Sequence, residues 1–517
     1  MSVVKKQRLI PLITTFLALS IYSDNLHAWA SNARNDPFPM YTSLDPQYFL
    51  YEREKQLMFG RADEKGTPER IMISISPFGQ NATEAKTIAA TYCKVPDFAQ
   101  GLNSITCAGQ CNNVTCSNPV PAGCNLCANA VPLGDIDGRW NLLGLLAGRF
   151  PAGFNTNTVP LLSGAFSALY PGTPPGTIDS ANIDYTPFDP CNPLFGYVSV
   201  PLKYRKRGIR WDIEAQICGD FGLQFQGGVV EISQVLNPCF TNLTNAQTEV
   251  TFCSPVNGAT VNAASITCSL FEQLVPLAAQ LGMNICNFTK WGFEDMFVSL
   301  YWRHAHIINF NRDLSWARLL LIPFFRIGGG IATGHPKDPS VIFSLPFGNN
   351  GSNSVNFNVG MNFDFVETVE VGGEVGYSHF FKKDFAHFRI PTNVMQSGIF
   401  PFSTSASVQP GDSAYVAGKM AAYHFLDRLS FYFQWVFVHH RKDCITLLDA
   451  DPTFLLVDDQ NPQSKCPNTA WRVQLGNIAF TYDISPNLAL GFLWQQMFHV
   501  RNAYNSTTAL FTLNLIF

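Results

Sequence analysis

The last eleven residues of the chain, TTALFTLNLIF, strongly limit what this sequence can fold into. Every odd-numbered position is apolar from Ala509 through Phe511, Leu513 and Leu515 to Phe517. The even-numbered positions include the polar Thr508, Thr512 and Asn514. Because successive side chains of a strand point to opposite faces, this pattern predicts a two-faced strand that is long enough to cross a bilayer when tilted. The alternative is an ordinary final strand of a soluble sheet.

The opposite end of the chain predicts export. Lys5, Lys6 and Arg8 precede a largely apolar segment of 14 residues, 9–22, and Ala28-Trp29-Ala30 offers a small-residue cleavage site. This is the pattern of a secretory signal peptide, and it is shorter than the roughly 20 apolar residues that a spanning helix needs. We therefore predict a signal peptide at 1–30, an N-terminal periplasmic segment at 31–66 and the main domain at 67–517.

Composition favours a membrane protein that crosses with strands. Charged residues make up 14% of the chain, against about 25% in an ordinary soluble domain, and aromatic residues make up 13%. After the N-terminal segment no run of 18 apolar residues occurs. A closed barrel is the other structure that pairs every backbone group inside a bilayer. The formal net charge of −4 argues against nucleic acid as a partner.

Several internal segments alternate in the same way over 9 to 11 residues, which is the length of a tilted transmembrane strand. Examples are 209–217, 355–365 and 429–437. If their apolar positions face lipid, the polar ones face the interior of a barrel. The predicted pore-lining residues are Arg210, Asp212, Glu214, Asn356, Asn358, Asn362, Asp364, Gln434, Arg472 and Gln474.

The fold class predicted from these segments is all-β, a transmembrane antiparallel β-barrel. Thirteen candidate strands can be counted, among them 194–204, 209–217 and 220–232, with a short turn at 205–208. Single-chain bacterial barrels have an even number of strands. Assigning 220–232 to the following loop removes the odd strand, and the long segment 79–193 has room for further hairpins. We therefore expect 14 to 16 strands, with short turns at one end and long cysteine-rich extracellular loops at the other.

The 14 cysteines of an exported chain favour disulfide bonds. Cys444 and Cys466 bracket one long segment, and Cys191 and Cys218 fall at the outer ends of predicted neighbouring strands; we predict these two pairs. The pairing of the remaining cysteines stays open. A zinc site is the alternative, since Cys124 and Cys127 have ligand spacing, but no histidine follows at finger spacing. We expect no metal and no cofactor.

Transport is the function that the predicted barrel and the lack of enzyme motifs favour. The sequence has no nucleophile elbow, no zinc-protease motif and no dinucleotide fingerprint, so we do not expect an enzyme. We predict passive diffusion of small hydrophilic solutes and ions through a water-filled barrel. Two alternatives stay open: a disulfide-cross-linked structural or adhesive envelope barrel, and a plugged substrate-specific transporter.

The signal peptide, the strand pattern, the cysteine-rich loops and Phe517 together resemble the cysteine-rich major outer-membrane porins of chlamydia-like bacteria. The resemblance implies a general porin in the bacterial outer membrane. It implies that Phe517 belongs to the membrane-insertion signal that the barrel-insertion machinery reads. The other partners expected are outer-membrane lipid, small solutes, and a homotrimer or disulfide-linked envelope proteins.

Overall fold

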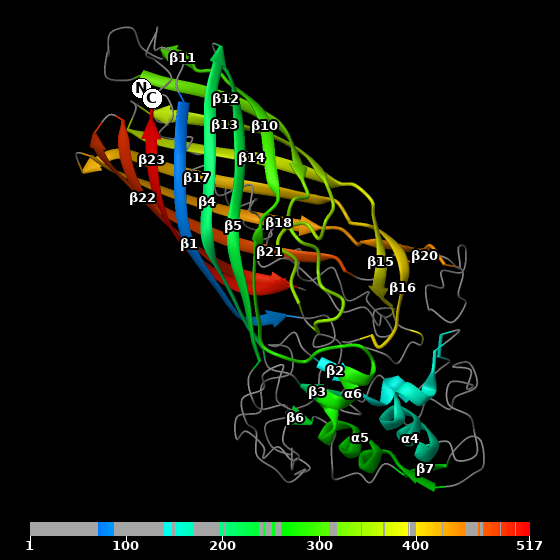
Figure 1. Cartoon of the computed structure of the whole chain (residues 1–517). Coiled ribbons are helices and arrows are strands. Elements are labelled where there is room, and N and C mark those ends of the chain that lie inside the picture. Colours follow the sequence, from blue (N-terminus) through cyan, green and yellow to red (C-terminus); the bar gives the residue numbers. More distant parts are fainter. Residues whose placement is uncertain are drawn as a thin grey trace, which may run out of the picture.

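The computed structural model shows one large antiparallel barrel with a cap of smaller elements beyond one end (Figure 1). The structure describes residues 71–86, 139–146, 150–151, 154–169, 197–199, 202–218, 220–236, 241–242, 251–253, 260–309, 318–342, 344–365, 368–390, 392, 400–426, 428–449, 464–465, 469–485, 487–501 and 503–517. The predicted signal peptide and the segment 31–66 lie outside these residues. Within these residues, no helix combines the length and the apolar character needed to cross a membrane.

Twelve strands form the closed wall that the described residues build. In order around the barrel they are β1 (Ile71–Lys86), β4 (Leu202–Cys218), β5 (Phe221–Leu236), β10 (Met296–Arg303), β12 (Arg318–Ile331), β13 (Ser354–Phe365), β14 (Val369–Phe380), β17 (Ser413–Leu426), β18 (Leu429–His440), β21 (Trp471–Ser485), β22 (Leu488–Arg501) and β23 (Ala503–Ile516). Two short strands extend the wall beside β10: β9 (Phe288–Phe293) pairs with β5, and β11 (His306–Asn309) pairs with β12.

The first and last strands close the barrel. β1 pairs with β23 along most of its length, from Met72 opposite Ile516 to Lys86 opposite Ala503. The backbone of Phe517 completes the seam, because its amide donates to the Ile71 carbonyl at 2.9 Å and its carbonyl accepts from the Ile71 amide at 3.2 Å. Every barrel strand thus has a neighbour on both sides, and the predicted all-β antiparallel barrel is confirmed.

The two ends of the barrel differ in the length of their connections. At one end, which we call the turn rim, β4 joins β5, β13 joins β14, β17 joins β18 and β21 joins β22 through two or three residues each. Phe517 lies at this rim. At the other end, which we call the loop rim, the long connections are 87–201, 237–287, 332–353, 381–412 and 441–470, whereas β22 and β23 are joined through residue 502 alone.

The expected strand number of 14 to 16 was too high. Two errors cancel each other: residues 205–208 form no turn but lie inside β4, a single strand of 17 residues, whereas the segment assigned to a loop, 220–232, forms most of β5. The described part of 79–193 adds only the end of β1, the short strand β2 (Arg139–Asn141), two 3-10 turns and the helix α4 (Pro160–Leu169). None of these elements after β1 joins the barrel sheet.

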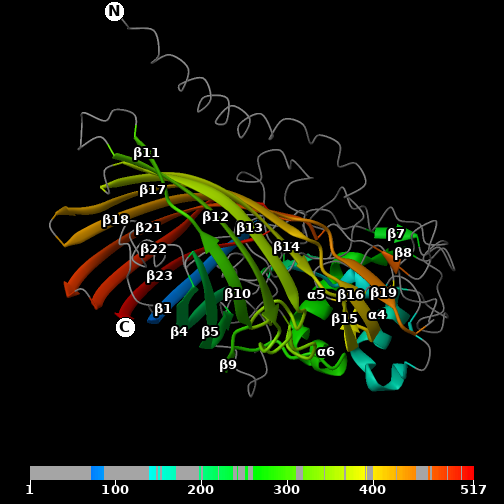
Figure 2. The same cartoon turned by 90° about the horizontal axis from the view of Figure 1, so that it is seen from above.

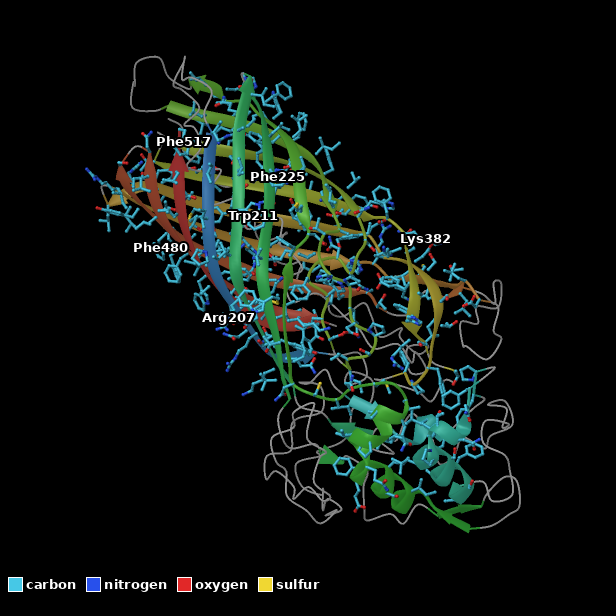
Figure 3. The ribbon with its side chains drawn as sticks, in the orientation of Figure 1. Arg207, Trp211, Phe225, Lys382, Phe480 and Phe517 are labelled. Carbon is cyan, nitrogen blue, oxygen red and sulfur yellow. The ribbon has the colours of Figure 1, made fainter. Side chains whose placement is uncertain are left out.

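The outer surface of the barrel carries an apolar belt. Ile209, Phe357, Val375 and Phe511 are between 47% and 59% exposed, although large apolar side chains are normally buried in a soluble domain. Figure 3 marks four apolar side chains of this wall: Trp211, Phe225, Phe480 and Phe517. An outward apolar band on a closed barrel is the surface that a bilayer solvates.

The cap lies beyond the loop rim (Figures 1 and 2). Its helices α4, α5 (Ala263–Glu272) and α6 (Leu274–Gln280) bury apolar side chains such as Leu162, Phe166 and Leu277. A second sheet, formed by β15 (Lys383–Arg389), β16 (Ser403–Gln409), β19 (Cys444–Leu447) and β20 (Ser464–Lys465), stands beside the helices. The apolar segment 271–283 holds the end of α5 and all of α6, and the described part of 140–150 contains a short strand and a 3-10 turn.

Arg389 connects three parts of the cap. Its guanidinium donates to the carbonyl oxygens of Pro339 at 2.7 Å, Pro401 at 2.6 Å and Gly282 at 3.0 Å, and burial lowers its pKa to about 10. Replacing it, in the variant Arg389→Met, removes the donor from two partly buried contacts, those to Pro339 and Pro401, and from the exposed contact to Gly282. Such a loss costs about 1–3 kcal/mol for each unsatisfied group.

We therefore expect Arg389→Met to speed proteolytic cleavage within 332–353 and 381–412 by at least about tenfold, while the barrel stays folded. The measurement is limited proteolysis followed by mass spectrometry. Lys383→Met, an exposed cation on the same strand, is the control and should be cleaved at the wild-type rate. Equal cleavage of both variants would show that Arg389 does not hold the loops together.

Candidate functional site

The interior of the barrel is polar along β4, β13 and part of β18. Eight of the ten predicted pore-lining residues lie on the inward face, where they alternate with exposed apolar residues: Arg210, Asp212, Glu214, Asn356, Asn358, Asn362, Asp364 and Gln434. The alternation follows from strand geometry in a wall whose other side meets an apolar environment. Their part in conduction stays a prediction.

Arg472 and Gln474 lie on the outward face instead. Arg472 is paired with His439 and Gln474 with Phe437 on β18, whereas the inward positions of β21 are Trp471, Val473 and Leu475. Both faces at the start of β21 carry apolar or amphipathic side chains. The assumption that the apolar face of a strand points toward lipid therefore assigned the wrong face here. The inward set joins a buried apolar cluster with Tyr415, Ala417, Val436, Val438, Met497, Val500 and Ala503.

A buried ionic group stands between β4 and the junction of β9 with β10. The Glu294 carboxylate accepts two hydrogen bonds from Arg210, each of 2.8 Å, and lies 2.5 Å from the Lys206 ammonium. All three side chains are at most 5% exposed. The Arg210 guanidinium also lies 4.0 Å from the centre of the Phe78 ring. One carboxylate therefore holds two buried cations against the inner wall.

A second ionic group lies nearer the turn rim. Lys419 on β17 lies 3.1 Å from Glu370 on β14, and the Tyr423 hydroxyl donates to the same carboxylate at 2.9 Å. Glu214 on β4 accepts a hydrogen bond from Tyr301 on β10. Charged and hydrogen-bonding groups from β4, β10, β14 and β17, and from the junction of β9 with β10, thus line the interior at two heights.

A small cavity lies beside β10, β12 and β13. Its polar lining comes from Gln226, Ser299, Arg326, Asn356, Asn358 and Ser378. The cavity exists because several inward positions here carry small residues such as Ser299, Gly328 and Ser378. The Asn358 amide donates to the Tyr415 hydroxyl at 3.0 Å, and this tyrosine separates the cavity from the apolar cluster.

The interior is narrow. Asp212, Asn362 and Glu374 are between 2% and 4% exposed, and Gln434 and Asn477, which are hydrogen-bonded to each other at 2.9 Å, are 0% and 1% exposed. Side chains that border a wide aqueous channel would be much more exposed. The described part of the barrel interior is therefore constricted.

The predicted disulfide bonds and the predicted insertion signal involve five residues. Two of the four cysteines lie outside the described residues, and Cys218 lies at the opposite rim from the one expected. Cys444 begins β19 in the cap and stays the predicted partner of Cys466, which lies outside the described residues, as does Cys191. Cys218 ends β4 at the turn rim and not at the outer end of a strand, because β4 runs through the whole wall. Phe517 is 67% exposed at the turn rim, and its role as insertion signal stays a prediction.

No metal-binding cluster emerges from the described residues. Groups of three or more histidine, cysteine, aspartate or glutamate side chains placed to hold a metal ion are absent among them. The pair His304 and His306 have ring centres 4.3 Å apart, and the first of them is hydrogen-bonded to Asp220 at 2.7 Å. This pairing satisfies His304 without a metal.

Sequence reasoning missed most of the buried ionic residues. Glu370 and Glu374 alternate with Val369, Val371 and Val375, so the alternation used for β13 could have placed them. Lys419 gave no such signal, because both faces of β17 are apolar around it. Glu294 lies between two short strands, and only the tertiary structure brings it to Lys206 and Arg210.

Comparisons with known proteins find no matching family model and no matching curated protein. Among solved structures, an outer-membrane channel from Pseudomonas putida F1 matches with a TM-score of 0.39 and 7% identity, over 89% of this chain and 99% of the other. The translocator domain of the autotransporter NalP from Neisseria meningitidis gives 0.30 and 7%, over 90% and 93%. The porin NanC gives 0.24 and 8%, over 60% and 92%.

These three TM-scores lie below 0.5, so the assignment as a barrel rests on the strand pairing of the chain itself. The solved structures are outer-membrane barrels of different functions. A particular resemblance to the porins of chlamydia-like bacteria is not among these findings and stays an expectation from the sequence.

Proposed function

We propose that this protein is a narrow channel of the bacterial outer membrane that conducts small hydrophilic solutes and ions by passive diffusion. The observation that carries the proposal is a closed wall with an apolar outer belt and an inner face on which charged and amide side chains follow one another along the barrel. Rings of fixed charge and hydrogen-bonding groups select among small ions and solutes in such a lumen. Short turns are periplasmic in barrels of this kind, which makes the loop rim extracellular.

Because the inner side chains are buried, we expect a narrower channel than the general porin predicted from the sequence. A wall of twelve strands encloses less space than the 16 to 18 strands of water-filled porins, and its side chains fill much of that space. We therefore expect low conductance and a strong dependence on the lumenal charges, in contrast to a general diffusion pore.

Two arginines on opposite faces of the wall provide the test. Arg210→Gln removes an inward cation, so the cation-to-anion permeability ratio should rise, by about two- to fivefold. Arg472→Gln removes an outward cation of the same type and should leave the ratio unchanged. The measurement is the reversal potential in a salt gradient across a planar bilayer. Equal ratios in all three proteins would contradict a lumenal role for Arg210.

A substrate-specific transporter is the second candidate, and one observation favours it. The apolar cluster on β17, β18 and β21 to β23 covers the inner wall near the loop rim, which is unusual for a purely aqueous path. If folded, inserted protein shows no conductance steps, then a gated transporter or a structural envelope barrel becomes the better description. Non-reducing electrophoresis of intact envelopes then separates these two, because only the structural barrel predicts disulfide-linked oligomers.

A further inference from the structure

Three cations share the outer face of β4 next to the loop rim. Lys203, Arg205 and Arg207 are two residues apart on the outward side of the strand, and all three are exposed. Figure 3 shows Arg207 at the end of the barrel wall nearest the cap, among nitrogen-tipped side chains that point away from the wall. Cations on the outer face of a barrel are costly at the bilayer midplane and inexpensive at the interface, so their height matters.

Two features place these cations at the interface. Below them on the same face, the outward residues run from Ile209 through Trp211 and Ile213 to Ile217, about 26 Å along the strand at roughly 3.3 Å per residue. At the usual strand tilt of about 40°, this length covers roughly 20 Å of height, which is most of the apolar band of outer-membrane barrels, about 25 Å tall. At the level of Arg207, Trp291 on β9 is 61% exposed, and aromatic residues of this kind mark the interface.

The neighbouring strands surround the cations with hydrogen-bonding groups. Arg207 is held by Glu231 through its Nε at 2.8 Å and one terminal nitrogen at 3.2 Å, so its other terminal nitrogen points elsewhere. Asn81 on β1 and Ser233 on β5 flank Arg205, and Thr289 on β9 donates to the Ser233 hydroxyl at 3.3 Å. Among the described residues, Lys203 and Arg205 form no ion pair.

We propose that this surface binds the phosphate of an anionic lipid headgroup in the leaflet beside the loop rim. The site combines the exposed cations Lys203 and Arg205 with Arg207, which Glu231 already orients. The amide of Asn81 and the hydroxyl of Ser233 lie beside Arg205 on the paired strands, and the hydroxyl of Thr289 lies beside Ser233. Arginine and lysine recognise phosphate through charge-assisted hydrogen bonds, and basic surfaces at a membrane interface bind phosphorylated headgroups. The apolar residues directly below, Ile209 and Trp211, would contact the acyl chains of the same lipid. The inference rests on the proposed placement in a membrane, but not on conduction.

The test is native mass spectrometry of the full chain in detergent with two lipids that share dioleoyl chains, phosphatidic acid and phosphatidylcholine. We expect preferential retention of phosphatidic acid. The variant Lys203→Gln/Arg205→Gln should weaken it about 30-fold, because each basic residue near an anionic lipid surface contributes roughly a factor of five. The charge-preserving variant Lys203→Arg/Arg205→Lys should retain the lipid. Lys383→Gln/Lys442→Gln, with the same loss of charge in the loops, should also bind like the wild type.

Three results would overturn the proposal: equal retention of the two lipids, no loss in the Lys203→Gln/Arg205→Gln variant, or displacement of phosphatidic acid by an equal concentration of inorganic phosphate. The last would show a site for free anions. A protein that retains the lipid but gives no conductance steps would refute the channel function alone.

Discussion

Replacing Glu294 by glutamine should lower the free energy of unfolding of the barrel by about 3–5 kcal/mol, the usual cost of removing one partner of a buried ion pair. The reason is that one carboxylate balances two buried cations. Both Lys206 and Arg210 contact Glu294, and all three side chains are at most 5% exposed. Glutamine keeps the shape of the side chain but leaves two cations in a poorly solvated interior. The measurement is urea unfolding in detergent, followed by the shift between folded and unfolded bands on a gel.

Two further variants make this result specific. Asp338→Asn removes the acid of the Lys290–Asp338 pair, whose side chains are 45% and 31% exposed, and should cost less than about 1 kcal/mol. Combining Glu294→Gln with Lys206→Gln removes one of the stranded cations and should recover part of the lost stability. If Glu294→Gln and Asp338→Asn have equal effects, the interior around Glu294 is well solvated and the constricted conformation is wrong.

Gly208→Ala should destabilise the barrel by about 1–3 kcal/mol, even though it adds a single methyl group. A Cβ at position 208 would lie 2.2 Å from the Val229 carbonyl oxygen and 2.8 Å from the Val230 Cα. Both are backbone atoms of β5, so β4 and β5 would have to separate locally. The same unfolding experiment measures the effect, and a loss of the folded band at lower urea concentration is the expected result.

Gly418→Ala is the matched control, because a Cβ there has no atom within 4 Å. This substitution should leave stability unchanged or raise it slightly, since alanine reduces the conformational freedom of the unfolded chain. Similar losses in both variants would mean that any side chain at a strand glycine is harmful. Close contact between β4 and β5 would then not be the cause.

Gly208 also shows where sequence reasoning reached its limit. A glycine after Arg205, Lys206 and Arg207 has the composition of a tight turn, and this reading divided β4 into two strands. In the structure the glycine allows a close approach of two backbones, and the charges belong to two different surfaces: Lys206 faces inward, whereas Arg205 and Arg207 face outward. Glycine within a strand often marks such an approach, but local sequence does not distinguish it from a turn.

Other parts of the fold were predictable because one physical rule governs them. The apolar belt imposes a period of two on β13 and β18, and eight inward residues on β4, β13 and β18 followed from it. The rule failed at β21, where the inner wall is itself apolar and Arg472 lies on the outside. The alternation rule could not predict the ion pairs of Glu294, because its partners Arg210 and Lys206 are 84 and 88 residues earlier in the chain. Ion pairs across a barrel depend on tertiary geometry, and periodicity within one strand carries no information about them.

The seam between β1 and β23 has a consequence for the timing of assembly. The other adjacent wall strands follow one another along the chain, with 87–201 as the longest connection, but this pair joins residues that are 446 positions apart, Ile71 and Phe517. β1 is made early and must wait for the final strand, so a nascent or truncated chain exposes two unpaired strand edges at once. Unpaired edges recruit other chains, and even a short C-terminal deletion would therefore turn a self-contained cylinder into an adhesive sheet.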